Sequence, residues 1–388
     1  MVAGHLQEKK GKYYIVLSYK DELGKKKTKW QSTGLDIKGN KKRAEDLLQK
    51  ARKEFDPIAI NESEITFTGF MKSWLKMMKP SLELTTYSGY SYSINSIICP
   101  YFEEKNLLLK ELQPKHIQDF YTYCMNERNV KARSVIRYHA NIRKALKYAV
   151  NTDLLSSNPA DKVQRPKVQK FIGKFYDIDE VNELLNTVKG TPIELPVMLA
   201  AFYGLRRGEI VGLKWDAIDF KNNTISICHT VTSIVVDGKQ TIIEKDRAKN
   251  KSSHRTLPLV GEFHEILSKL RERQEEYKIL CGRSYNKEFL DYICVNEMGN
   301  RIMPNYVTDN FTNTLLKNNM RRIRFHDLRH TAASLLLNAG VSMKEIQEWL
   351  GHSDFGTTAN IYGHLDVNAK LRSADAMLAT GMRLLAPT

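Results

Sequence analysis

The sequence lacks several features that would place a protein outside the cytosol. No apolar segment of signal length lies near its start, and no run of eighteen apolar residues occurs anywhere. We therefore expect neither secretion nor a membrane-spanning helix. The five cysteines form no C-x-x-C pair and have no histidine at metal-ligand spacing, so we expect reduced, mostly buried, cytosolic thiols and no metal site. They are Cys99, Cys124, Cys228, Cys281 and Cys294.

Acidic residues are also in short supply. The chain has 388 residues, with 44 Asp and Glu against 60 Lys and Arg, a formal net charge of +16. Hydrophobic residues make up 42% of it, which is enough to build cores for two or three domains. The basic surface should attract polyanions, and nucleic acid is favoured over an anionic membrane. A generally basic protein with no such partner is the alternative.

Residues 1–55 concentrate the positive charge, with fifteen Lys and Arg against seven Asp and Glu. The runs YYIVLSYK and KKKTKWQSTGL flank a turn at Asp21 to Gly24 and predict two strands, and a helix is expected from Lys41 to Phe55. Cations beside aromatic residues on a small sheet are typical of a DNA-contacting module. A solvated basic lid is the alternative. The candidate DNA-binding residues here are Lys25, Lys27, Lys29 and Trp30.

Residues 64–155 repeat apolar positions at three- and four-residue spacing and predict four helices. Prolines are expected to separate them, at Pro80, Pro100 and Pro114. The polar positions from Arg128 to Lys147 are rich in Lys and Arg, which predicts one basic side of the bundle and makes candidate DNA contacts of Arg133, Arg137 and Lys144. The following stretch, 156–174, has two prolines and little apolar content, so a tether lying on phosphate is expected.

Two segments of the remaining chain carry candidate basic groups. In FYGLRRGEIVGLKW, residues 202–215, a glycine precedes a helical pattern with Arg206, Arg207 and Glu209 near its start. Residues 222–259 alternate as strands do, with a hairpin turn at Asp237-Gly238. A basic loop, Lys245 to His254, then precedes the last strand. This loop contains Lys249 and Lys251, and a solvated turn is the plain interpretation of it.

RFHDLRHTAASLLLNAG, residues 324–340, predicts a helix whose basic residues share one side. His326, Arg329 and His330 fall on that side, and we expect it to face away from the core. Gly340 should end this helix. Ser342 and Glu345 form a capping box for the next helix, which Gly351 closes, leaving His352 at its C-terminal end. A helix-turn-helix DNA reader would explain the same two short helices.

These motifs occur in the order seen in tyrosine recombinases, and the chain resembles a lambda-like integrase of a phage or integrative-conjugative element. The resemblance implies a multidomain α+β fold in three parts. Residues 1–55 would form an arm-type DNA-binding domain with a small sheet and a helix. Residues 64–157 would form a helical core-binding bundle, and residues 175–388 a mainly α catalytic domain with a small antiparallel sheet. The motifs are GLRRGE (204–209), RTLPL (255–259), HDLRHT (326–331), LGHS (350–353) and the segment 358–365.

The resemblance also assigns chemical roles. Attack on a phosphodiester adds charge to its oxygens, so it calls for fixed cations, and two guanidiniums suit that task. The resemblance gives this role to Arg206 and Arg329, and the role of nucleophile to Tyr362, which would form a 3′-phosphotyrosyl bond. Lys249 would protonate the leaving 5′-hydroxyl, with Lys251 as its rival. His326 would assist proton transfer, His352 would bind the phosphate, and Glu209 would orient a basic side chain. Neither a metal nor another cofactor is expected.

The implied partners are double-stranded DNA at core and arm attachment sites and three further copies of the chain in a synaptic tetramer. DNA-bending and excision accessory proteins are further expected partners, and no membrane is expected. Such an enzyme would work in the bacterial cytoplasm, at the nucleoid, integrating and excising a mobile element. A final amphipathic stripe, with Val367 and Leu371, is expected to dock on a neighbouring protomer. A type IB topoisomerase-like enzyme and a non-catalytic DNA-binding protein are the alternatives.

Overall fold

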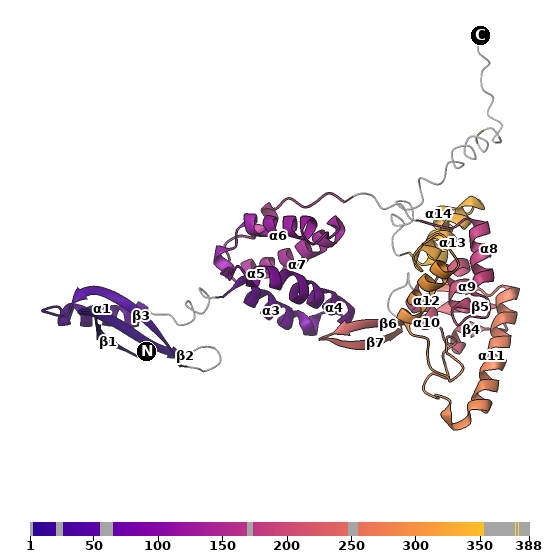
Figure 1. Ribbon diagram of the computed structural model, residues 1–388, viewed down its shortest axis with the longest axis horizontal. Helices are drawn as coiled ribbons and strands as arrows, with labels where there is room; N and C mark the ends of the chain where they lie inside the picture. Colours follow the sequence, from indigo (N-terminus) through magenta and orange to yellow (C-terminus); the bar gives the residue numbers. More distant parts are fainter. Residues whose placement is uncertain are drawn as a thin grey trace, which may run out of the picture. The chain divides into compact units, whose positions relative to one another are not determined.

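The computed structural model describes residues 3–20, 26–54, 65–168, 174–246 and 255–352, together with positions 377 and 379. The chain divides into two units, Met1–Val168 and Gln169–Thr388. The mainly helical architecture with small antiparallel sheets is the expected fold class (Figure 1). None of the helices in these ranges is long and apolar enough to cross a membrane.

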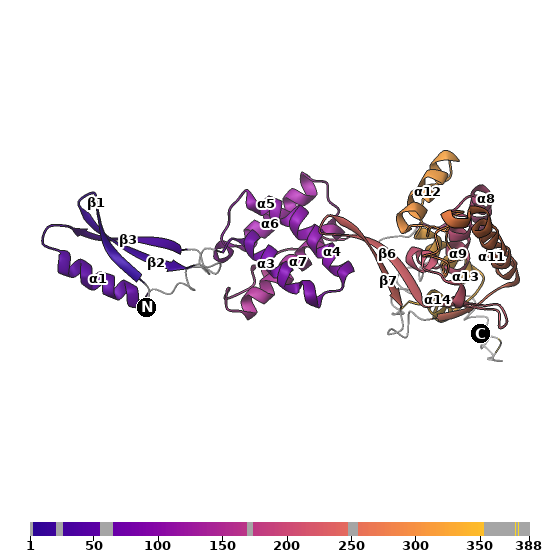
Figure 2. The same cartoon turned by 90° about the horizontal axis from the view of Figure 1, so that it is seen from below.

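The first unit begins with a three-stranded antiparallel sheet in the order β1-β2-β3. Its strands are β1 (Ala3–Lys9), β2 (Lys12–Lys20) and β3 (Lys26–Asp36), and the helix α1 (Lys41–Glu54) packs along the sheet (Figure 2). The helix and the last two strands confirm the prediction. The first strand was not predicted, because AGHLQEK is mostly polar and most of its side chains are exposed.

Four helical segments follow, as predicted, but one proline does not separate two of them. They are α3 (Phe67–Met78), a continuous run through α4 (Leu84–Ser93) and α5 (Cys99–Glu103), α6 (Pro114–Asn126) and α7 (Ala132–Asn151). Pro100 lies inside the continuous run, just after a π-helical turn at Ile94–Ile98. A proline ring clashes with the carbonyl four residues earlier in an α-helix, and the wider turn changes that geometry.

The stretch expected to be a tether belongs partly to the helical bundle. Its residues Pro159–Lys162 form a 3-10 turn that contacts α6 and α7, and Pro159 and Ala160 are buried. Arg143 of α7 donates to Asp161 at 2.6 Å, and the Gln164 amide donates to the side chain of Gln118 at 3.1 Å. The prediction of a tether from residue 156 was therefore wrong for its first half, because Pro159 and Ala160 are buried in a turn that packs on α6 and α7.

In the described part of the second unit, helices and two small sheets surround a large hydrophobic core, and a smaller cluster of Ala333, Leu337, Ile346 and Leu350 lies between α13 and α14. Its sheets have the orders β4-β5-β8 and β6-β7. The turn Asp237-Gly238 has positive φ at both residues, 49° and 80°, which confirms the predicted hairpin. Its elements are α8 (Ile178–Val188), α9 (Glu194–Tyr203), α10 (Arg207–Val211), β4 (Ile218–Asp219), β5 (Thr224–Ile227), β6 (His229–Val236), β7 (Lys239–Asp246), β8 (Arg255–Pro258), α11 (Gly261–Cys281), α12 (Pro304–Lys317), α13 (Asp327–Asn338) and α14 (Met343–Leu350).

The helix α13 lies at the centre of this unit and is buried on almost every side. It contacts both α9 and α14. Arg329 is only 2% exposed and His330 is also buried, so the prediction that the basic side faces away from the core was wrong for both residues. The capping box of Ser342 with Glu345 and the left-handed Gly351 at the end of α14 confirm the predicted ends of the next helix.

Candidate active site

Arg206 is held at the start of α10 by the glutamate three residues later. Its backbone N–H donates to Glu209 Oε2 at 2.9 Å, and its guanidinium donates to Glu209 Oε1 at 2.7 Å. A third bond runs from Nη2 to the carbonyl oxygen of Gly351 at 3.2 Å. The side chain is about one-third exposed, so its guanidinium is anchored on one side and reaches solvent on the other.

Arg329, on α13, also binds the C-terminal end of α14. Its Nη1 donates to the carbonyl of Gly204 at 2.6 Å, and its Nη2 donates to the carbonyl of Leu350 at 2.7 Å. Leu350 and Gly351 are the last residue and the C-cap of α14. Two arginines that are more than a hundred residues apart therefore bind neighbouring carbonyls, where the C-terminal end of a helix dipole favours positive charge.

Glu209 is the buried acid of this cluster, with an exposed fraction of only 1%. Burial alone would raise the pKa of its carboxyl. The charges of Arg255 and Arg206, with their hydrogen bonds, outweigh that effect and lower the pKa to about 2. The carboxylate therefore stays ionised at neutral pH and compensates two of the surrounding guanidiniums.

His352 follows α14 and completes the helix end. Its backbone N–H donates to the carbonyl of Gln347 at 3.0 Å, and its own carbonyl accepts from the Gln347 side chain at 3.1 Å. Loss of water around the ring and the positive charges of Arg329 and Arg206 lower the pKa of His352 to about 3. The imidazole is thus neutral in the free protein, in surroundings that would favour an anion.

His326 precedes α13, and its ring lies 5.5 Å from that of His330 in an edge-to-face arrangement. Partial removal of water, then the neighbouring His330 and Arg329, lower the pKa of His326 to about 4. Burial also lowers the pKa of His330. Both rings are consequently neutral at pH 7. Each then has one N–H group that donates a hydrogen bond and one unprotonated nitrogen that can accept a hydrogen bond or a proton.

Arg255, which the sequence analysis did not single out, belongs to the same cluster. It donates from Nη2 to Glu209 at 3.1 Å and from Nε to the carbonyl of Trp349 at 2.9 Å. The only available signal was its place in the RTLPL motif next to the lysine loop. Arg207, by contrast, donates to the side-chain hydroxyl of Thr308 on α12 at 2.6 Å.

Several candidates lie outside the described residues. Lys249 and Lys251 belong to the segment 247–254, Tyr362 to the C-terminal segment, and Lys25 to the segment 21–25. The strands on either side of the lysine segment are described: β7 ends at Asp246 and β8 begins at Arg255. Lys245 still belongs to β7, where it pairs with Thr230 of β6, so the strand extends further than predicted.

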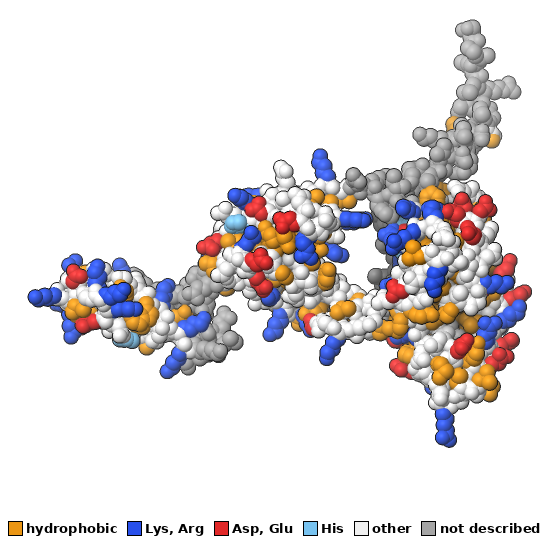
Figure 3. Space-filling view, in the orientation of Figure 1, with side chains coloured by type: hydrophobic (Ala, Val, Ile, Leu, Met, Phe, Trp, Pro, Cys, Tyr) orange, Lys and Arg blue, Asp and Glu red, His pale blue; other side chains and the backbone are white. Residues whose placement is uncertain are grey.

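The described candidate DNA contacts of the first unit are exposed, but those on the sheet do not share one face. Trp30 pairs with Val16 on β2, and Lys9 lies 5.3 Å from the centre of its ring. Lys27 and Lys29 alternate with Trp30 along β3 and therefore project from the opposite face. On α7 the spacing of Arg133, Arg137 and Lys144 places all three on one exposed side. Figure 3 shows Lys and Arg side chains distributed over these parts.

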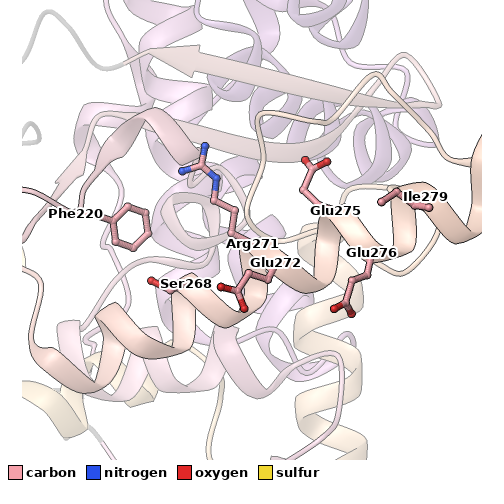
Figure 4. Close-up of a pocket in the computed structure, with 7 residues that line it drawn as sticks. All are labelled: Phe220, Ser268, Arg271, Glu272, Glu275, Glu276 and Ile279. Atoms are coloured by element: carbon pink, nitrogen blue, oxygen red, sulfur yellow. The ribbon is translucent and has the colours of Figure 1, made fainter.

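A shallow pocket of about 510 Å³ lies on α11, away from the arginine cluster (Figure 4). Its charged residues are three glutamates and a single arginine, which does not suit a phosphate group. Phe220 and Ile279 add apolar surface. Among the residues that the structure describes, no group of three His, Cys, Asp or Glu side chains could hold a metal ion. The residues lining the pocket are Phe220, Ser268, Arg271, Glu272, Glu275, Glu276 and Ile279.

The two arginines, the buried glutamate and the three histidines lie within a region that matches a known protein family. The model of the phage integrase family covers residues 174–369, and the model of the phage integrase N-terminal SAM-like domain covers residues 66–125. The chain belongs to the phage integrase family. It is therefore a tyrosine recombinase, an enzyme of site-specific recombination.

Relatives of this integrase align over most of its length. It is 27% identical over 337 residues to a tyrosine recombinase XerC-like protein of Caldanaerobacter subterraneus subsp. tengcongensis, covering 82% of this chain and 84% of the relative. It is 28% identical over 385 residues to the prophage ps2 probable integrase of Lactococcus lactis, covering 95% and 97%. The ICEBs1 integrase of Bacillus subtilis is 25% identical over 349 residues, covering 88% and 90%.

Solved integrase structures share the fold. The Tn1549 transposon integrase in complex with a circular intermediate DNA matches with a TM-score of 0.64 and 16% identity, over 80% of this chain and 99% of that one. A lambda integrase dimer bound to a COC′ core site matches with a TM-score of 0.58 and 16% identity, over 91% and 93%.

Proposed function

We propose that this integrase cuts and rejoins DNA through a 3′-phosphotyrosyl bond to Tyr362, in order to integrate and excise a mobile element. One observation carries the proposal. Arg206 and Arg329 converge on adjacent carbonyls at the end of α14, ten residues or so before the tyrosine in the sequence. A phosphate that enters beside them would receive donors from two permanently charged groups.

The proposed roles follow from the charges at this helix end. The two guanidiniums stabilise the extra negative charge that attack builds on the phosphate oxygens. His352 donates to the phosphate, and neutral His326 accepts the proton of the tyrosine hydroxyl. Glu209 keeps Arg206 in place. Lys249, or Lys251 as its rival in the same loop, protonates the departing 5′-oxygen, so that the cut strand leaves as an alcohol.

The domain assignment is proposed on the same basis. Residues 1–55 would bind arm sites through Lys25, Lys27, Lys29 and Trp30. Residues 64–157 would bind core sites through Arg133, Arg137 and Lys144, and residues 175–388 would carry the chemistry. The exposed stripe on α7 supports the second of these roles, because aligned cations match a phosphate backbone. The lambda integrase has been solved as a tetramer bound to a Holliday junction, and we propose the same number of protomers here.

Covalent trapping tests the chemistry. The protein is mixed with nicked duplexes tiled across the DNA that flanks its own gene, denatured in detergent, and examined for a shifted protein–DNA band. We expect a band with wild type on the duplex that contains the core site and no band with Tyr362→Phe. An adduct that persists in Tyr362→Phe would show that another residue is the nucleophile.

Two other outcomes would point to the alternatives. Tight, salt-sensitive binding to a duplex without any adduct would indicate a DNA-binding protein without strand cleavage. Relaxation of supercoiled plasmids that lack the core site would indicate a topoisomerase-like enzyme.

A further inference from the structure

Arg255 is a buried arginine next to the loop that carries the candidate lysines. It is the first residue of β8, directly after segment 247–254, and its backbone is fixed by pairing with Ile227 of β5. Its side chain is 7% exposed. Removing a guanidinium from water costs free energy unless partners compensate it, so its contacts within the protein define its role.

Two hydrogen bonds of its side chain lead to different elements. Nη2 reaches the Glu209 carboxylate of α10, and Nε reaches the carbonyl of Trp349 in the last turn of α14. Because both acceptors belong to the protein, these bonds do not require DNA. Arg255 thereby connects the start of β8 with two elements that hold the candidate active site.

Glu209 transmits this connection to Arg206. Its Oε2 accepts both the Arg255 guanidinium and the Arg206 backbone N–H, while Oε1 accepts the Arg206 guanidinium. The glutamate side chain has no solvent-exposed surface, so it cannot replace a lost partner with bulk water. Without Arg255 the carboxylate would turn toward its remaining cation, and Arg206 would move with it.

We propose that Arg255 is a positioning residue for DNA strand cleavage, which fixes Glu209 and through it Arg206 against the end of α14. This inference rests on the proposed function, in which Arg206 contacts the phosphate that is cut. Arg255 itself does not touch the DNA in this proposal. Its contribution is the geometry of Arg206.

A lysine cannot make the same connection. Arginine offers separate donors in a planar fork, whereas lysine offers one nitrogen on a flexible stem. Arg255→Lys keeps the charge beside Glu209 and loses the simultaneous bond to Trp349. A displacement of about 1 Å at a reacting group can reduce a rate about a hundredfold. We therefore expect Arg255→Lys to slow cleavage by roughly 10- to 100-fold.

The test measures single-turnover adduct formation on saturating core-site duplex. Wild type, Arg255→Lys, Arg206→Lys and the double variant are compared, together with DNA affinity and thermal midpoint. If Arg255 acts through Arg206, the double variant is about as slow as Arg206→Lys alone. Core-site affinity should stay close to that of wild type, because Arg255 acts within the protein in this proposal. Arg321→Lys, which alters an arginine–glutamate pair with Glu180 elsewhere in this unit, is the matched control and should cleave at the wild-type rate.

Each other result would overturn the inference. Losses that multiply in the double variant would mean that Arg255 acts independently of Arg206. An unchanged cleavage rate in Arg255→Lys would mean that Arg255 does not position Arg206. If Arg321→Lys also cleaved slowly, with an equal fall of its thermal midpoint, the slower rate of Arg255→Lys would reflect lost stability and Arg255 would have a structural role only. Arg255→Gln serves as a second variant, and failure of both to fold would make Arg255 a folding residue. Failure of the proposed function itself is distinguished by wild type forming no adduct.

Discussion

At the scale of single residues, Glu209 is the buried acid that two arginines of the candidate site share. Its carboxylate compensates Arg206 and Arg255, and breaking a buried ion pair on one side costs about 3 kcal/mol. We expect Glu209→Gln to lower the free energy of unfolding of the catalytic unit by that amount in urea titrations at pH 7. The matched control is Glu180→Gln, which alters the partly exposed pair with Arg321 and should cost under about 1 kcal/mol.

The same residue gives a pH dependence with a defined sign. The pKa of Glu209 is lowered to about 2, so an unfolded chain binds a proton at this carboxyl before the folded chain does. The stability that it contributes is fully present above its ordinary pKa and is lost as the pH falls toward 2. Wild type should therefore lose more stability than Glu209→Gln between about pH 4.5 and pH 2. Equal losses would mean that the pKa of Glu209 is not lowered in the folded protein.

His352 should take up a proton when DNA binds. In the free protein partial burial and nearby arginines lower its pKa to about 3. A phosphate beside Arg206 and Arg329 would offset those charges and raise the pKa, so binding should tighten as the pH falls below about 6.5. Core-site affinity measured between pH 7 and pH 5 checks this. His352→Gln should weaken the pH dependence, and an unchanged pH dependence in that variant would contradict a role for His352 at the phosphate.

At the scale of elements, Gly204 joins α9 to the arginine cluster. It has φ of +63°, and a Cβ at this position would lie 2.4 Å from a methyl carbon of Leu350, while its carbonyl accepts from Arg329. Gly204→Ala should lower the free energy of unfolding by about 2 to 4 kcal/mol, through backbone strain and overpacking, and should slow adduct formation. Thermal unfolding and covalent trapping measure the two effects.

Gly190→Ala is the control for that substitution. Gly190 has a similar φ of +73°, but nothing lies within 4 Å of the position its Cβ would take. Its loss should therefore be the strain alone, about 1 to 2 kcal/mol, with an unchanged rate of adduct formation. If the two variants lost equal stability, the contact between Gly204 and Leu350 would not matter for the fold.

The elements also show which features the sequence could predict. Helices with regular apolar spacing, such as α3 and α7, and turns with a specific backbone requirement, such as Asp237-Gly238 and Gly351, were predictable because the signal is local. The polar strand β1 was not, since its pairing with β2 is satisfied by backbone groups rather than by side-chain pattern.

The burial of Arg329 could not be predicted from the sequence for a related reason. Helical periodicity assigns charged residues to the solvent side, but the carbonyls of Gly204 and Leu350 make an internal site for its guanidinium. Those acceptors lie 125 and 21 residues away in the sequence. Arg255 was missed in the same way, because its partners are on α10 and α14. When the hydrogen-bond acceptors of a charged side chain are distant in the sequence, the periodicity of its own helix or strand does not reveal them.

At the scale of the whole molecule, the formal charge of +16 should make DNA affinity depend on salt concentration. Each phosphate neutralised by Lys or Arg releases a counterion, so the logarithm of affinity falls with the logarithm of salt by about 0.9 per contact. On α7 the exposed residues Arg133, Arg137 and Lys144 follow one side of the helix. If all three bind phosphates, replacing them together with alanine should reduce the magnitude of the slope by about 3.

Salt titrations of core-site binding measure that slope. The control replaces three other exposed lysines of the helical bundle, Lys76, Lys110 and Lys115, which changes the net charge equally. A general attraction between a basic protein and DNA would make the two triple variants weaken binding to the same degree. A smaller salt slope in the α7 variant alone would mean that the stripe lies along the DNA backbone, and equal slopes would mean that charge acts here without a defined surface.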